Sequence, residues 1–220
     1  MSTVPFFNRE MIEARAARAL REFQRRTGDP LSFPIDIDLV GEIVFDLCWD
    51  WDVLPEQAGE RVLAALYVAD RRAVLNQTYK NLFDSKRGME RFTRAHEIGH
   101  ADLHVKPGML GQSVDKQQVI FHRDTGECTE RELRSQYWRE RQADWYAAAL
   151  TMPGDRFMEV VRRQPVKSPA DAEQLAEFFG VSYTALNLRL RDHGLPYFDR
   201  DGVRRVSQKT PMNQPSLFDK

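Results

Sequence analysis

The segment FTRAHEIGH, Phe92–His100, contains an HExxH pattern formed by His96, Glu97 and His100. Residues four apart share one face of a helix, so both imidazoles can bind a single ion. Neutral imidazole is a standard zinc ligand. Glu97 directly follows the first ligand, where its carboxylate can take a proton from zinc-bound water as a general base. The segment therefore predicts a zinc-dependent hydrolytic site on a helix over residues 90–104.

A second predicted helix, over residues 130–151, carries two acidic residues on an otherwise core-directed stripe, Glu140 and Asp144. Buried carboxylates are costly unless they are paired or bound to metal. Catalytic zinc takes three protein ligands and leaves one position open. We therefore predict Glu140 as the third ligand and Asp144 as the acceptor for the N–H of a ligating histidine. The competing third ligands are Asp102, His104, His122 and Glu132.

Other residues near the motif allow several interpretations. His104 lies one turn after His100, closer than the HExxHxxGxxH pattern requires, so local hydrogen bonding at the helix end is the simpler role. His122 and Tyr79 are candidates for stabilising a transition-state oxyanion. Gly99 lowers the helix propensity of the motif, which indicates close packing against another element.

The composition narrows the class of protein. The 220 residues are 42% hydrophobic and 30% charged, and 32 basic against 33 acidic residues give a net charge of −1. A chain of this kind can form a hydrophobic core, and it is neither a basic nucleic-acid coat nor a polyacidic protein. Two distant cysteines, no apolar stretch behind a basic N-terminus and no long apolar run predict a cytoplasmic protein.

The rest of the first half predicts helices and one hairpin. Apolar residues recur at helical spacing over residues 8–27 and again over Ile37–Leu47. Two apolar runs, Val62–Ala69 and Ala73–Asn76, predict a β-hairpin at the edge of a small sheet. Gln112–Gly126 is polar, and we expect it to be irregular.

The C-terminal third predicts a helical pair after a helix that follows Met152-Pro153-Gly154. Ser168 begins the first helix of the pair, Ser182 caps the second, and the spacing resembles a helix-turn-helix. A DNA-reading second helix would expose Thr184, Asn187 and Arg191. The alternative is a helical subdomain that packs on the zinc domain without DNA, and the neutral charge favours it.

The motifs FTRAHEIGHADLH and ERQADWYAAALTMP together resemble the ImmA/IrrE family of HExxH metallopeptidases, over roughly residues 10 to 195. The resemblance implies a gluzincin-like site with one Zn²⁺ ion, in which His96, His100 and Glu140 are ligands and Glu97 is the catalytic glutamate. It also implies a protein substrate, a DNA-binding transcriptional repressor, cleaved in a stress or mobile-element response. The chain departs from the family at Thr151, where the family has leucine, and this change does not touch the site.

These inferences combine into an α+β fold with three parts. Residues 1–154 form a zincin-like metallopeptidase domain with a small sheet, residues 155–200 a helix-turn-helix-like subdomain, and residues 201–220 a disordered tail. The alternative function is a metal-binding regulatory or DNA-binding protein that keeps a non-hydrolytic site.

The tail contains one further pattern, Gln214-Pro215-Ser216-Leu217-Phe218. It resembles the peptide with which bacterial proteins dock on the replicative sliding clamp, and Gln214, Leu217 and Phe218 would make that contact. A disordered segment can bind in this way at an ordering cost. We expect deletion of residues 213–220 to abolish pull-down of the clamp, and equal retention by the truncated chain would contradict the prediction.

Overall fold

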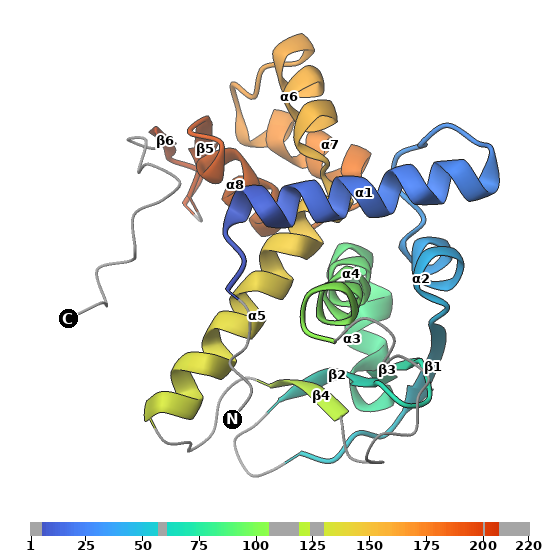
Figure 1. Cartoon of the computed structure of the whole chain (residues 1–220). Helices are drawn as coiled ribbons and strands as arrows, with labels where there is room; N and C mark the ends of the chain where they lie inside the picture. The colour runs from blue at the N-terminus through green and yellow to red at the C-terminus, as the bar shows by residue number, and fades with distance from the viewer. Residues whose placement is uncertain (1–5, 57–60, 106–118, 124–129, 200, 207–220) are drawn as a thin grey trace.

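The fold combines a small mixed sheet with helices that gather over it (Figure 1). The computed structural model describes residues 6–56, 61–105, 119–123, 130–199 and 201–206. The helices are α1 (Arg9–Thr27), α2 (Ile37–Phe45), α3 (Lys80–Ser85), α4 (Arg87–Leu103), α5 (Glu130–Thr151), α6 (Gly154–Arg163), α7 (Pro169–Phe179) and α8 (Tyr183–Asp192). The strands are β1 (Cys48–Asp52), β2 (Val62–Tyr67), β3 (Arg72–Asn76), β4 (Val119–Arg123), β5 (Pro196–Phe198) and β6 (Arg204–Val206), and a short 3₁₀ helix, η1 (Gln77–Tyr79), follows β3.

The main sheet has the strand order β1-β3-β2-β4. β2 and β3 form the predicted hairpin, closed by a turn in which Arg71 has a positive φ of 51°. β1 pairs with β3 in parallel, and β4 pairs with β2 in antiparallel orientation. The hairpin is therefore the centre of the sheet, and the prediction that it lies at an edge is wrong.

Helix α4 lies between the sheet and the N-terminal helices, as Figure 1 shows. Asn8 caps α1 by accepting from the Met11 N–H, and Gly28 ends the helix with a φ of 77°. Apolar residues of α1, α2, α4 and α5 share one buried cluster with Leu66 of β2. This packing encloses α4, the HExxH helix. One side of α4 contributes buried residues to the cluster, and another side of α4 faces the strands.

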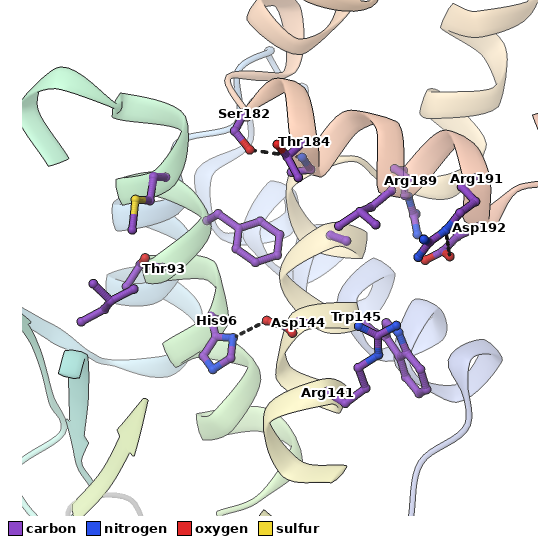
Figure 2. Close-up of a pocket in the computed structure, with 16 residues that line it drawn as sticks. Thr93, His96, Arg141, Asp144, Trp145, Ser182, Thr184, Arg189, Arg191 and Asp192 are labelled. Carbon is purple, nitrogen blue, oxygen red and sulfur yellow. Dashed lines mark hydrogen bonds and ion pairs between the residues drawn. The ribbon is translucent and has the colours of Figure 1, made fainter. Parts of the chain in front are cut away.

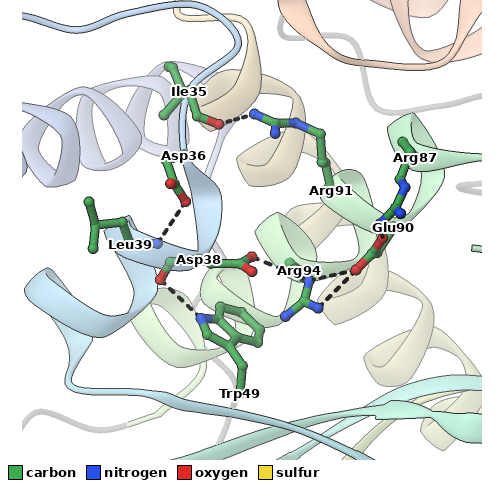
Figure 3. A network of polar contacts seen from close by, with 9 residues as sticks. All are labelled: Ile35, Asp36, Asp38, Leu39, Trp49, Arg87, Glu90, Arg91 and Arg94. Atoms are coloured by element: carbon green, nitrogen blue, oxygen red, sulfur yellow. Dashed lines mark hydrogen bonds and ion pairs between the residues drawn. The ribbon is translucent and has the colours of Figure 1, made fainter. Parts of the chain in front are cut away.

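A buried cation joins α4 to α2 and β1 (Figure 3). Arg94, which is 7% exposed, donates to Glu90 Oε1 at 2.9 Å and lies 3.3 Å from Asp38 Oδ1. Its guanidinium lies 5.1 Å from the Trp49 ring centroid, and the Trp49 indole N–H donates to the Asp38 carbonyl at 3.0 Å. A buried charge is tolerated when carboxylates and ring faces surround it. The network fixes the outer side of α4 two residues before His96.

The C-terminal helices form a second apolar cluster, with Phe157 and Phe179 at its centre. Ser168 and Asp171 make the predicted capping box at the start of α7, and Ser182 caps α8. Arg189 of α8 is buried and joins this part to the rest of the chain. It binds both carboxylate oxygens of Glu13 in α1, and it donates to the Met152 carbonyl at 2.8 Å.

Several elements differ from the sequence predictions. β1 was not predicted, and β4 lies within the segment expected to be irregular. The disordered tail was predicted to begin at residue 201, but Asp201–Val206 include β6, which pairs with β5 because Asp199 accepts from the Val203 N–H and holds the connecting turn. The remaining tail, with Gln214, Leu217 and Phe218, lies outside the described residues. None of the described helices has the length and apolar character needed to cross a membrane.

The start of α4 packs directly on the turn between α7 and α8. A Cβ on Gly88 would lie 2.6 Å from the Val181 carbonyl carbon and 2.7 Å from the Ser182 nitrogen. Backbone atoms cannot move aside as a flexible side chain can. Overpacking at this position would therefore cost about 1–3 kcal/mol of stability, which exceeds the gain in helix propensity from alanine.

We expect Gly88→Ala to lower the free energy of unfolding by about 1–2 kcal/mol in denaturant titration. Gly154→Ala is the matched control, since its Cβ would meet its first neighbour, the Glu13 carboxylate, at 3.4 Å. Equal stability of the two variants would contradict the packing argument.

Candidate metal centre

Three side chains from two helices bring their donor atoms together. His96 Nε2 lies 3.0 Å from His100 Nε2 and 3.1 Å from Glu140 Oε2, and His100 Nε2 lies 3.5 Å from Glu140 Oε1. Both histidines are buried, and the Glu140 side chain is 18% exposed. The structure thus assembles the predicted ligand set, with a more open side at the carboxylate.

The close approach of α4 and α5 makes this meeting possible. A Cβ on Gly99 would lie 3.1 Å from Ala143 Cα and 3.1 Å from Tyr146 Cβ. A larger residue would push the helices apart and separate the histidines from Glu140. The predicted packing role of Gly99 agrees with this geometry.

Asp144 binds the far side of the first histidine. His96 Nδ1 lies 3.0 Å from Asp144 Oδ1, and a dashed line in Figure 2 marks this contact. Burial alone would lower the pKa of His96, but hydrogen bonds to Asp144 and Glu140 outweigh it and raise the pKa to about 10. A carboxylate on Nδ1 fixes the tautomer and leaves Nε2 directed at the donor group.

The second histidine has a partner one turn further along, and this contact agrees with the local hydrogen bonding predicted for His104. His100 Nδ1 lies 3.0 Å from His104 Nδ1, and His104 Nε2 lies 3.4 Å from Gln142 Oε1. Burial, with repulsion from His100, lowers the pKa of His104 to about 3, so this ring is neutral. If His100 binds metal through Nε2, its Nδ1–H donates to His104, whose Nε2–H then faces Gln142. His104 supports a ligand, and the four-residue spacing from His100 was the signal for this role.

Glu97 is enclosed beside the donors. It is fully buried, and neither carboxylate oxygen has a hydrogen-bond partner among the described residues. Burial raises the pKa of Glu97 to about 8, against the opposing charge of His96. Buried carboxylate oxygens are costly to leave unbonded, so a ligand of this group belongs in the site.

The donor set fits a zinc ion. Three ligands, each about 2.0–2.1 Å from a tetrahedral ion, lie about 3.3 Å apart, and the observed separations of 3.0 to 3.5 Å bracket that value. Two imidazoles and one carboxylate are a common catalytic zinc set. His96, His100 and Glu140 would hold the ion, and the unbonded oxygens of Glu97 adjoin it.

One competing third ligand and one candidate for oxyanion stabilisation have other partners. Asp102 accepts from Arg15 at 2.9 Å, so it is engaged in an ion pair. Tyr79 donates its hydroxyl to Glu56 Oε1 at 2.8 Å and is thereby committed to the loop after β1. The side chains of His122 and Glu132 lie outside the described residues, so their proposed roles stay predictions.

The structure corrects one of the predicted DNA contacts. Asn187 is 7% exposed, donates to the Tyr183 carbonyl and accepts from the Phe198 N–H at 2.8 Å. Its amide holds β5 against α8 and cannot read a base, so this part of the prediction is wrong. Thr184 and Arg191 remain accessible, and both line a pocket behind the donor group, on the side of Asp144 (Figure 2).

That pocket has a volume of about 300 Å³ and reaches His96 and Asp144 at one end. Its walls come from β2, α4, α5 and α8. No direct signal in the sequence predicts this pocket, because its residues share no motif and meet only through the packing of distant helices.

Comparisons with known proteins agree with this geometry. A peptidase family described as the IrrE N-terminal-like domain matches residues 84–191, across the predicted boundary at residue 154. A solved structure of a Mycobacterium tuberculosis transcriptional regulator is similar with a TM-score of 0.50 at 18% identity, which bears on the fold alone. The match covers 89% of this chain and 56% of that one, so this chain spans little more than half of the regulator's length. The search of curated proteins gives no match.

The two histidines of α4, the glutamate of α5 and the fold that joins them lie within the matched segment. This match to the IrrE N-terminal-like domain, over just under half of the chain, supports assignment to the ImmA/IrrE family, and the fold is zincin-like.

Proposed function

We propose that the protein is a zinc-dependent endopeptidase that cleaves a specific protein partner. One observation carries the proposal: three ligand atoms within 4.8 Å of one another adjoin a buried glutamate whose carboxylate is unbonded among the described residues. A structural core would not leave such a carboxylate unsatisfied. The role of an HExxH glutamate as a general base for water explains why this carboxylate is unbonded.

Each side chain of the site has a distinct role in the proposed hydrolysis. A bound zinc ion would supply Lewis acidity, polarising a carbonyl and making water more acidic. Glu97, with its pKa raised to about 8, can accept a proton from water and return it to a leaving amine near neutral pH. Asp144 and His104 orient the two imidazoles from behind, so that both Nε2 atoms stay directed at one point.

We further propose that the substrate is a DNA-binding transcriptional repressor. The family membership supports this class of partner, and the similarity to a transcriptional regulator is compatible with a regulatory setting. The competing function is a regulator that keeps a metal site without hydrolysis. The two differ in whether Glu97 is needed for the biological effect.

We expect Glu97→Gln to bind one zinc ion per chain like the wild type but to cleave the partner repressor at least about 100-fold more slowly, since an amide cannot act as a base. The measurements are metal analysis and cleavage of a candidate repressor, identified by capture on the Glu97→Gln protein. Glu173→Gln, on the exposed side of α7, is the control for loss of one charge. If Glu97→Gln processes the partner at the wild-type rate, hydrolysis is not the function.

Removal of metal should make stability depend on pH. Folding raises the pKa of Glu97 from 4.5 to about 8 and that of His96 from 6.5 to about 10. The folded protein therefore holds protons that the unfolded chain releases, and the stability that these protons contribute is lost as the pH rises through the folded-state values.

We expect the melting temperature of the metal-free protein to fall between pH 7 and pH 9, measured in chelator. Zinc requires a deprotonated His96, so its stabilising effect should grow over the same range. Glu97→Gln should flatten the profile of the metal-free protein below pH 8. A melting temperature that rises from pH 7 to pH 9 would contradict the assignment of these two groups.

A further inference from the structure

The pocket behind the donor group has two unlike walls. β2 and α4 supply an apolar wall that contains Leu63, Met89 and Phe92. Among the described residues, every carboxylate and guanidinium of the lining comes from the other wall, formed by α5 and α8, and Figure 2 shows Arg141 and Asp144 there. An apolar cavity of about 300 Å³ with a few placed polar groups is the usual form of a small-molecule site.

Two charged side chains of α5 face this pocket without pairing to each other. Arg141 and Asp144 lie three residues apart, so they share one side of the helix. Asp144 accepts from His96 through Oδ1, and the Arg141 guanidinium lies over the Trp145 ring, 5.6 Å from its centroid. Among the residues that the structure describes, neither Asp144 Oδ2 nor the Arg141 guanidinium has a partner of opposite charge. A ligand that carries both charges complements this pair.

The rest of the pocket limits what such a ligand can carry. In a free α-amino acid the ammonium and the carboxylate sit on one carbon, so both can reach one turn of α5 while the side chain points away from them. That side chain would meet the apolar wall and Leu188 of α8, a lining residue that is 42% exposed. A charged side chain would lose its hydration there without a compensating contact, while an apolar one would gain from burial.

We propose that this pocket binds a free α-amino acid with an apolar side chain of the size of leucine, methionine or phenylalanine. Asp144 would bind the ammonium and Arg141 the carboxylate, by charge-assisted hydrogen bonds. The site is separate from the place where hydrolysis would occur, because Glu97, His100 and Glu140 do not line the pocket. The proposal goes beyond the peptidase function and does not depend on it.

Asp144 connects this second site to the candidate metal centre. Its Oδ1 accepts from His96 Nδ1 at 3.0 Å, on the side of the ring away from the donor atoms. An ammonium on the same carboxylate would make it a weaker acceptor, and a histidine with a weaker acceptor behind it is a poorer zinc ligand. The amino acid should therefore lower the zinc affinity, and zinc should lower the amino-acid affinity by the same factor.

A series of leucine analogues tests the pocket on the full-length metal-free protein by calorimetry. 4-Methylpentanoate lacks the ammonium, 3-methylbutylamine lacks the carboxylate, glycine lacks the side chain, and glutamate carries a charged one. We expect leucine to bind at least about tenfold more tightly than each of these four compounds. The series uses the wild-type chain and so needs no variant to fold.

Arg141→Gln tests the assignment of the carboxylate. We expect this variant to weaken leucine binding at least about tenfold and to leave the affinity for 3-methylbutylamine unchanged, since that compound has no carboxylate. Arg156→Gln is the matched control, because Arg156 is a helical arginine of α6 that does not line the pocket. The control should bind leucine like the wild type.

Competition with a chelator tests the connection to the metal centre. At saturating leucine, we expect the wild-type protein to bind zinc at least about threefold more weakly than without it. Arg141→Gln controls for zinc that leucine itself binds in solution, and its zinc affinity should change less than that of the wild type.

The contrary outcomes are distinct. If 4-methylpentanoate or 3-methylbutylamine binds as tightly as leucine, the pocket does not recognise an amino acid and the proposal is wrong. Absence of leucine binding at millimolar concentration overturns it as well. If leucine binds and the zinc affinity of the wild type stays the same, the connection through Asp144 is wrong. None of these results decides the Glu97→Gln cleavage test, so the two functions fail or stand separately.

Discussion

The close approach of α4 and α5 at Gly99 is the constraint on which the candidate metal centre depends. Two donors come from one helix and the third from the other, and they meet within 3.0 to 3.5 Å because no Cβ separates the helices there. Contacts outside the site maintain that approach. The Arg94 network holds the outer side of α4, and the apolar cluster shared with α1 holds α5 against it.

The local part of this design could be predicted from the sequence. Helical spacing alone places His96 above His100 and Glu140 above Asp144, since residues four apart share a face. The roles of Glu140 and Asp144 also follow from chemistry, because buried carboxylates on a core stripe need a cation or a hydrogen-bond donor. For the same reason of locality, the hairpin and the cap at Ser168 were predicted correctly.

The rest depends on contacts between distant segments. β1 alternates tryptophan with aspartate, and its Trp49 packs against Arg94 and Asp38, which come from other elements of the chain. In the sequence, Asn187 resembles a base-reading side chain. In the fold, its amide binds the backbone of β5 instead. A single sequence contains no local signal for either pairing. The pocket formed by four separate elements cannot be predicted from the sequence for the same reason.

The buried Arg189 has a consequence for how the chain unfolds. Its guanidinium binds Glu13 in the first helix and the carbonyl of Met152 where α5 has just ended, so it bridges both sides of the boundary predicted at residue 154. Separating the two sides would break the ion pair with Glu13 and the hydrogen bond to Met152 together. This joint loss couples the two halves into one cooperative transition. The C-terminal helices are then held to the core around α4 and α5 as part of a single thermodynamic unit.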